Sequence, residues 1–417
     1  MMTQAYYTGI SGIKNNSTAI DVIADNMANV NTTGFRGYTT EFSNLFDETV
    51  MSGSVFDDSV GYGVQVQAVS MMKDEGSLAL SDKSTDIAIR GDGWFGMQQN
   101  GEVVYTRDGA FTFDANSDLV STDGFHVMGT MGGNIGEDDT LKFTIDSLPL
   151  GDVASQEKLR FPKNLTYPPK ASTNVKFLGN LGVTDTPYNL ATSVVDTQNN
   201  KNSLSIEFQR NEEQILPGSQ YRAIATITSA DGSITYDTQE GTVEFNETGG
   251  LISNTFTAID NNGSPINIDL GEGFDGITSI DLPYAPGSTV ADGTVGGELE
   301  GYQINKNAEV VATFTNGEQS SVGKIAVFHF ENEQGLEKLS GTRFVSSSNS
   351  GAAMFRQDAE GNNINGADVL NFKLENSNIE LSYGLTELII LQRAYDANSK
   401  SITTADQMMQ KALSMDA

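Results

Sequence analysis

The sequence contains no cysteine, which excludes disulfides, thiolate metal sites and a cysteine nucleophile. Histidine is almost as scarce, because the 417 residues include only His126 and His329. Neither histidine has a second histidine or a carboxylate near it at the spacing of metal ligands. The sequence therefore predicts no catalytic residue, no cofactor and no metal site built on histidine or cysteine.

Basic residues are also few, with 24 Lys and Arg against 55 Asp and Glu, a formal net charge of −31. Such a field repels phosphate backbones, so we expect no nucleic-acid partner. No apolar run approaches the about 20 residues of a membrane span. The first residues, Met1 to Tyr7, lack the basic and apolar regions of a secretory signal, so export would need a route without a cleaved signal.

What the sequence does contain between its ends is turn-forming text, with 43 Gly and many Thr, Ser, Asn and Asp residues. This composition favours β-structure with tight turns. Asn100-Gly101 and Asn316-Gly317 each divide two strand-like segments and predict hairpins. Prolines near residues 149–169 and 283–286 suggest the borders of an inserted β-domain.

Both ends of the chain are predicted to be helical, because apolar residues recur there at seven-residue intervals. The alternative is a pair of unrelated terminal helices packed on a globular core. The predicted packing residues are Tyr6, Ile10, Ile13, Ile20 and Met27 in the first helix and Leu381, Leu388, Leu391, Tyr395, Ile402 and Met409 in the second.

The first helix should stop in the stretch from Asn29 to Phe35, where Gly34 can adopt the positive φ that ends a helix. These observations together predict an α+β, multidomain fold. Its terminal helices pair as a coiled-coil-like axial domain, with two mainly β outer domains nested between them. The expected ranges are 1–31 and 379–417 for the axial domain, 32–70 and 366–378 for a connector, 71–148 and 289–365 for a β-domain, and 149–288 for an inserted, variable outer β-domain.

One motif resembles an enzyme site. Gly91, Gly93 and Gly96 form a G-x-G-x-x-G after a strand-like segment, but a dinucleotide site needs a helix to begin there. A hairpin follows instead, so these glycines are interpreted as turn residues. Asp114, Asn116 and Asp118 imitate the start of a calcium loop that lacks its glycine and its final glutamate, and they are also interpreted as turn residues.

Four segments resemble the signatures of the bacterial flagellar rod and hook axial proteins. They are Ala19 to Phe35, Asp86 to Phe95, Tyr105 to Phe111, and Asn376 to Leu381 followed by Leu391 to Asn398. The resemblance covers about 1–145 and 290–417 and leaves 165–285 without a signature. Position 94 is usually Phe in this family and is Trp here.

Within the family, the long insertion favours a hook subunit over a shorter rod subunit. The resemblance implies a non-enzymatic subunit that self-assembles into a hollow, bendable tube outside the cell and transmits torque from rod to filament. It also implies export by the flagellar type III apparatus and contacts with rod, hook cap and hook–filament junction proteins. The alternatives are a distal rod subunit of the basal body, a surface adhesin-like β-protein, and a nucleotide-dependent enzyme that rests on the three glycines alone.

Overall fold

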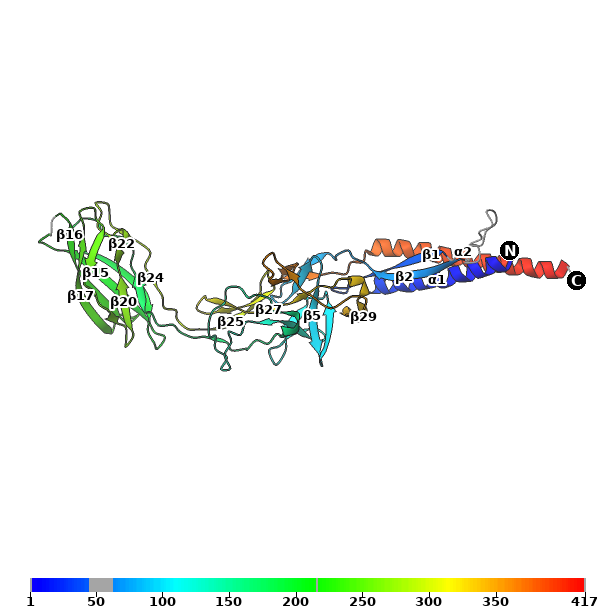
Figure 1. Ribbon diagram of the computed structural model, residues 1–417, viewed down its shortest axis with the longest axis horizontal. Coiled ribbons are helices and arrows are strands. Elements are labelled where there is room, and N and C mark those ends of the chain that lie inside the picture. Colours follow the sequence, from blue (N-terminus) through cyan, green and yellow to red (C-terminus); the bar gives the residue numbers. More distant parts are fainter. Residues whose placement is uncertain (1, 45–62, 215–216, 416–417) are drawn as a thin grey trace.

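The computed structural model describes residues 2–44, 63–214 and 217–415. It is elongated, with two helices at one end, a middle domain, and an outer domain at the far end (Figure 1). The prediction of a mainly β, multidomain chain with a helix at each terminus is confirmed. The coiled-coil character of the helix pair stays a prediction.

The helices α1 (Met2–Ala28) and α2 (Leu381–Met415) lie side by side (Figure 1). They run in opposite directions, because Gly9 lies against Ile402 near one end of the pair and Met27 against Gly384 near the other. The helix α1 ends at Ala28, three residues before the expected boundary at 31. The Asn29 side chain donates to the Asp25 carbonyl at 2.8 Å, which occupies one carbonyl of the last turn.

A two-stranded ribbon of β1 (Tyr38–Asn44) and β2 (Val64–Met71) runs along α1 (Figure 1). Polar side chains of α1 hold it there: the Val64 N–H donates to Ser11 Oγ at 3.1 Å and the Val66 N–H donates to Asn15 Oδ1 at 3.1 Å. The ribbon occupies part of the expected connector 32–70, of which residues 45–62 lie outside the described residues.

The middle domain is built on one sheet of thirteen strands, which combines segments from both halves of the chain. Asn100-Gly101 joins β5 to β6 and Asn316-Gly317 joins β26 to β27, so both predicted hairpins are confirmed. The strands of this sheet are β5 (Trp94–Gln99), β6 (Glu102–Thr106), β7 (Phe111–Phe113), β8 (Leu119–Ser121), β9 (His126–Met131), β10 (Glu157–Lys158), β11 (Thr166–Tyr167), β25 (Gly297–Ile304), β26 (Glu309–Phe314), β27 (Gln319–Ile325), β28 (Val327–Phe328), β29 (Glu337–Ser340) and β30 (Arg343–Val345).

Three strand pairs and two short 3₁₀ turns complete this part of the chain. They are β3 (Leu78–Leu80) with β34 (Lys373–Glu375), β4 (Ile87–Arg90) with β33 (Asp368–Asn371), β31 (Arg356–Gln357) with β32 (Asn363–Ile364), η2 (Val153–Ser155) and η3 (Glu333–Gly335).

Two of the expected boundaries are wrong. Leu159, Phe161 and Leu165 are fully buried in the core of the middle domain, so the insertion begins after β11 and not at residue 149. In the same way, β33 and β34 pair with strands of the middle domain, although the sequence predicts a connector over 366–378. Proline lacks an N–H donor, and therefore marks loops within a domain as readily as loops between domains.

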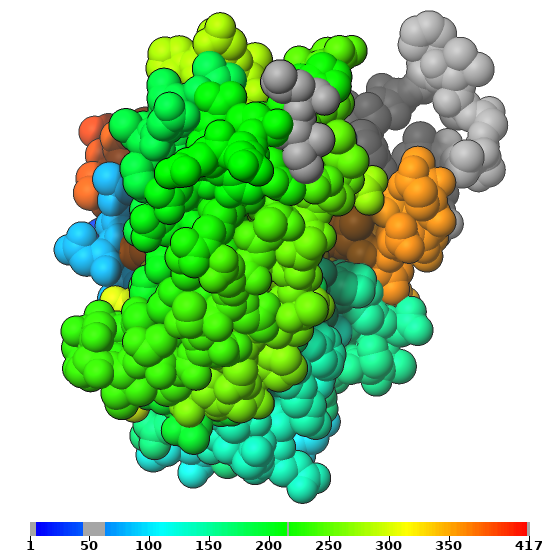
Figure 2. Space-filling model, turned by 90° about the vertical axis from the view of Figure 1, so that its left-hand side faces the viewer, coloured from blue at the N-terminus to red at the C-terminus, as the bar shows by residue number. Residues whose placement is uncertain are grey.

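The outer domain has its own hydrophobic core, formed by side chains between Val175 and Ile277. It forms the near surface when the molecule is viewed end-on (Figure 2). Two segments of the chain, one leading into the outer domain and one leading out of it, join it to the middle domain (Figure 1). Its strands are β12 (Asn174–Lys176), β13 (Gly179–Asn180), β14 (Tyr188–Val195), β15 (Lys201–Arg210), β16 (Ser219–Thr228), β17 (Thr235–Phe245), β18 (Leu251–Asn254), β19 (Ile259–Asp260), β20 (Pro265–Asp269), β21 (Gly271–Glu272), β22 (Asp275–Thr278), β23 (Ala285–Pro286) and β24 (Val290–Ala291).

Candidate assembly surface and the junction beneath it

The two helices meet through small side chains. On α1 the most buried positions include Gly9, Gly12, Ala19 and Ile23, which follow one another at steps of three, seven and four residues. A Cβ added at Gly9 would lie 2.7 Å from Ile402 Cγ1, which is closer than carbon atoms pack. The absence of a side chain at this position therefore permits the close approach of the helices.

The predicted packing residues divide between this interface and solvent. Ile13, Ile20, Met27, Leu388, Leu391 and Ile402 are half-buried, and Met27 and Ile402 lie against Gly384 and Gly9 of the opposite helix. The others are exposed, namely Tyr6, Ile10, Leu381, Tyr395 and Met409. The heptad pattern follows large side chains and misses the glycine and alanine positions that form the closest contact, although their spacing was readable in the sequence.

Large apolar side chains cover much of the outside of α2. Ile389 is 54% exposed and Ile390 is 60% exposed, although neighbouring positions of the helix are half-buried. Monomeric proteins rarely leave so many large apolar side chains of one helix in water. The exposed set on α2 consists of Leu381, Tyr383, Leu385, Ile389, Ile390, Tyr395, Met408, Met409 and Leu413.

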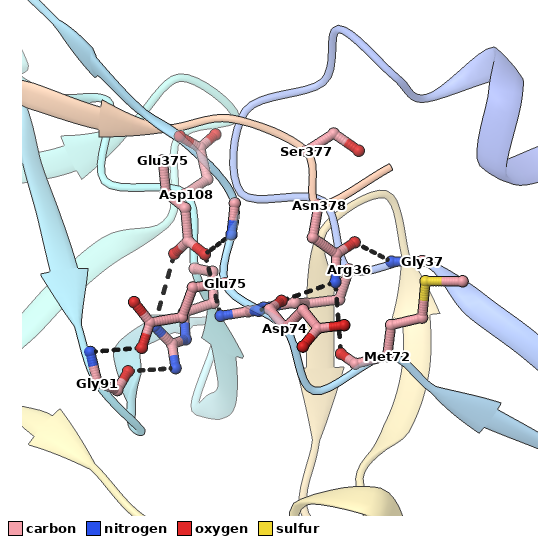
Figure 3. A network of polar contacts seen from close by, with 12 residues as sticks. Arg36, Gly37, Met72, Asp74, Glu75, Gly91, Asp108, Glu375, Ser377 and Asn378 are labelled. Atoms are coloured by element: carbon pink, nitrogen blue, oxygen red, sulfur yellow. Dashed lines mark hydrogen bonds and ion pairs between the residues drawn. The ribbon is translucent and has the colours of Figure 1, made fainter. Parts of the chain in front are cut away.

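Asparagines from both terminal segments hold the junction between helices and middle domain. The buried Asn26 side chain donates to the Tyr38 carbonyl at 2.6 Å and accepts from the Tyr38 N–H at 2.9 Å. Asn378 accepts from the Gly37 N–H at 2.8 Å and donates to the Asp74 carbonyl at 2.9 Å (Figure 3). These amides take the place of backbone partners, and so fix the end of α1 and the start of α2 to the same connector.

A buried ion network lies beside these amides (Figure 3). Glu375 Oε1 is 3.0 Å from Arg36 Nη2, and Glu375 Oε2 is 3.5 Å from Arg107 Nη1, with all three side chains at most 4% exposed. Burial and the nearby Arg36 charge lower the pKa of Arg107, while Glu375 opposes this shift. Glu375 is therefore the anion that makes two buried guanidinium groups tolerable. Nothing in the sequence pattern identified these three residues as partners.

Gly34 has the positive φ that the sequence predicted, at +67°. It does not end the helix, because α1 stops six residues earlier. Its N–H donates to the Glu375 carbonyl at 2.7 Å, and a Cβ there would lie 2.3 Å from the Asp108 nitrogen. The next residue, Phe35, is buried with Lys338 Nζ 4.9 Å from its ring centroid. Gly34 thus permits contact between the connector and the middle domain.

The G-x-G-x-x-G segment is a packing element. Strand β5 begins at Trp94, where a nucleotide site would need a helix. A Cβ at Gly93 would lie 2.5 Å from Val327 Cγ1, and one at Gly96 would lie 2.2 Å from the Phe328 ring. Gly91 is held by hydrogen bonds from its N–H to Glu75 and from Arg107 to its carbonyl, both at 2.8 Å. The interpretation as turn residues holds for Gly91 and Gly93, which have positive φ, while Gly96 only allows close packing.

The histidines occupy structural positions. His329 is 1% exposed and its Nε2 lies 2.6 Å from the Asn365 carbonyl, and burial lowers its pKa. His126 Nδ1 lies 3.5 Å from Asp118 Oδ2, because folding brings this carboxylate next to the histidine ring. Asp114 Oδ1 accepts the N–H groups of Asn116 and Asp118, which is the geometry of a turn. Among the described residues no cluster of three acidic or histidine side chains suited to a metal is found.

Asp108 provides a pH-dependent test of this junction. Burial raises its pKa from 3.8 to about 6, although it accepts a hydrogen bond from the Ala110 N–H at 3.0 Å. Because the folded state binds this proton more tightly than the unfolded chain, the contribution of Asp108 is most favourable below about pH 4 and is lost as the pH rises through about 6. We expect Asp108→Asn to stabilise the middle domain by about 2 kcal/mol at pH 7.5 and to change little at pH 4.

The measurement is urea unfolding at both pH values, followed by fluorescence of the single, buried Trp94. Asp146→Asn is the matched control, because this carboxylate of the same domain is exposed. Equal stability changes at pH 4 and pH 7.5 would contradict the assignment of a raised pKa to Asp108.

Comparison with known proteins places these features in a family. Three family models match: "Flagella basal body rod protein" over residues 7–36, "Flagellar hook protein FlgE/F/G D1 domain" over 88–163, and "Flagellar basal body rod FlgEFG protein C-terminal" over 373–415. The flagellar hook protein FlgE of Borreliella burgdorferi is 26% identical over 98% of this chain and 99% of its own length. Those of Salmonella typhimurium and Escherichia coli are each 27% identical over 97% of this chain and 98% of their own.

Among solved structures, the flagellar hook protein FlgE2 of Helicobacter pylori is similar with a TM-score of 0.57 and 15% identity. The match covers 72% of this chain and 100% of that one, and it shows a shared fold. The chain is therefore similar to the bacterial flagellar rod and hook axial protein family in three segments and to hook proteins over nearly its whole length. This is a family of structural proteins, which confirms the prediction that the chain is not an enzyme.

Proposed function

We propose that this chain is a structural subunit of the bacterial flagellar hook, outside the cell, where it polymerises into a hollow, bendable tube. The near full-length match to hook proteins of several bacteria supports the hook over the rod. The observation that carries the mechanism is the exposed apolar surface of α2. In water, burial of these apolar side chains against another subunit is favourable. In a polymer, each subunit has neighbours against which its α2 can be buried.

In this proposal the helices pair as a coiled-coil-like axial domain and form the inner wall. The connector, the middle domain and the inserted outer domain, taken as about 171–292, lie outside it. Apolar contacts between helices resist dissociation, whereas polar contacts between outer domains can slide as the tube bends. Torque from rod to filament then passes through a tube that is stiff to twist and soft to bend, as in a universal joint. Export through the flagellar type III apparatus and contacts with rod, hook cap and junction proteins complete the proposal.

The test compares two isoleucines with the same exposure. Ile389 on α2 and Ile234 on the outer domain are each 54% exposed, so aspartate at either position should leave the subunit folded. We expect Ile389→Asp to prevent tube formation, because a charge would enter an apolar wall at a cost of several kcal/mol. Ile234→Asp should assemble normally. Electron microscopy and sedimentation measure the tubes, and normal tubes from the Ile389 variant would overturn the wall assignment.

Salt should promote assembly. Subunits with a formal charge of −31 repel one another, and the Debye length falls to about 10 Å at 0.1 M salt. We therefore expect light scattering from polymer to rise between about 0.01 M and about 0.5 M sodium chloride. Polymer that dissolves as salt rises would indicate that ion pairs, and not the apolar helix surface, hold the subunits together.

A further inference from the structure

Two tyrosine rings lie stacked on each other in the outer domain. The ring centroids of Tyr188 and Tyr284 are 4.5 Å apart and their planes differ by 9°. The sequence has 13 tyrosines, and among the described residues the other close pair of tyrosine rings is Tyr6 with Tyr7, at 6.4 Å and 84°. Parallel stacking brings ring carbons of Tyr188 and Tyr284 into direct contact, whereas the edge-on pair offers little overlap.

The stacked pair joins the edges of two different sheets. Tyr188 is the first residue of β14, which is the outermost strand of the five-stranded sheet of the outer domain. Tyr284 directly precedes β23, which is the outermost strand of a four-stranded sheet of the same domain. Edge strands lack a hydrogen-bonded neighbour on one side and are the places where a sheet opens first. The two rings therefore lie where a link between the sheets has the largest effect.

Hydrogen bonds and packing hold the two rings in place. The Tyr284 hydroxyl donates to the Asn189 carbonyl of β14 at 3.1 Å, and the Tyr188 hydroxyl is hydrogen-bonded to Thr184. Both rings pack against the hydrophobic core of the outer domain and are half-buried. The stack is thus fixed on its inner side and remains open to solvent on its outer side.

The phenol groups offer a covalent link that this chain cannot make with cysteine, which it lacks. One-electron oxidation of a phenol removes one electron and the hydroxyl proton, and it leaves a radical that is shared with the ring carbons next to the C–O bond. Two such radicals in contact couple through these carbons, and the two ring protons move to the oxygens. Hydrogen peroxide, acting through a haem peroxidase, takes up the two electrons and two protons that were released and becomes two water molecules.

We propose that Tyr188 and Tyr284 form a site of oxidative cross-linking, at which hydrogen peroxide and a haem peroxidase join the two rings as dityrosine. The new carbon–carbon bond encloses residues 189–283, which contain most of the strands of the outer domain. Closing a long loop removes conformational freedom from the unfolded chain, so the link stabilises the outer domain as a disulfide would. The inference goes beyond the proposed function and does not depend on it, because the whole site lies within one subunit.

The experiment treats full-length monomer with hydrogen peroxide and lactoperoxidase, a haem peroxidase, and locates dityrosine by its fluorescence and by mass spectrometry of tryptic peptides. We expect most of the dityrosine to join Tyr188 to Tyr284 within one chain. Tyr284→Phe keeps the ring and removes the oxidisable hydroxyl, and should lower the yield of dityrosine by about tenfold. Tyr6→Phe, the matched control, removes one ring of the other tyrosine pair and should leave the yield near wild type. Absence of dityrosine, links mainly at other tyrosines or between chains, or an unchanged yield from Tyr284→Phe would overturn the proposal.

The stabilising effect is measured by trypsin digestion at increasing temperature. Release of the peptide 202–210 requires cleavage after Lys201 and Arg210, which belong to β15 and become accessible when the outer domain unfolds. We expect cross-linked chains to reach half-release at a temperature about 5 °C higher than untreated chains. Tyr284→Phe treated with the same oxidant should show no such rise, which separates the cross-link from other oxidative changes. Equal temperatures for cross-linked and untreated wild-type chains would show that the link does not stabilise the domain and would overturn that part of the proposal.

Discussion

Glu375→Ala should destabilise the middle domain by about 3–5 kcal/mol, because it leaves two buried arginines without their counter-ion. Arg36 and Arg107 are at most 4% exposed, so water covers little of either guanidinium group. The variant also removes the acceptor for the Gly76 N–H, which is 3.0 Å from Glu375 Oε1. Since the backbone of residue 375 also binds Gly34, the connector should loosen together with the core.

Urea unfolding of the monomer measures this effect through Trp94, whose ring lies 5.6 Å from the Arg107 guanidinium carbon. Glu300→Ala, at an exposed position of the same domain, is the matched control and should change the stability by less than about 0.5 kcal/mol. A third variant replaces Arg36, Arg107 and Glu375 together by methionine. It should lose less stability than Glu375→Ala, because no buried charge is left without a partner. A larger loss would mean that the site depends on the ionic contacts themselves.

The terminal helices and the two hairpins could be predicted from sequence because each depends on local pattern. Asn100-Gly101 can adopt the positive φ values of a tight turn, here +52° and +89°, whatever surrounds it. The apolar repeats at both ends were equally readable. The large apolar residues do not tell which side of each helix faces the other, since they serve both the pair and the exposed surface. Small residues such as Gly9 and Gly12 decide the close contact.

The junction could not be predicted, because its partners are distant in sequence. Arg36, Arg107 and Glu375 come from three segments that meet only in the folded chain, and no spacing rule relates them. The boundary at residue 149 failed for a related reason. Leu159 and Phe161 are isolated apolar residues in a proline-rich segment. Their burial depends on β-strands of the middle domain that follow residue 296 in the sequence. Of these residues only Arg107 lies in a segment that resembles the family signatures, and the resemblance does not say what its side chain contacts.

Gly34→Val should cost about 2–5 kcal/mol, the sum of two separate effects. A β-branched residue at φ +67° is strained by about 1–2 kcal/mol. The new Cβ would also lie 2.3 Å from the Asp108 nitrogen and 2.6 Å from the Arg107 carbonyl carbon, and both are backbone atoms that cannot rotate away. Overpacking of this kind costs about 1–3 kcal/mol. The connector must therefore move, and the helix pair that is attached to it must move as well.

Gly124→Val separates the two effects, because Gly124 has φ +80° and a Cβ added there would have no atom within 4 Å. It should lose only the conformational part, about 1–2 kcal/mol, and should still form tubes. Gly34→Val should lose more stability in Trp94-monitored unfolding and should assemble poorly, since its displaced connector misplaces both helices relative to the middle domain. If the two valine variants proved equally stable and assembled equally well, the contact between Gly34 and the Arg107–Asp108 backbone would have no role in positioning the helices.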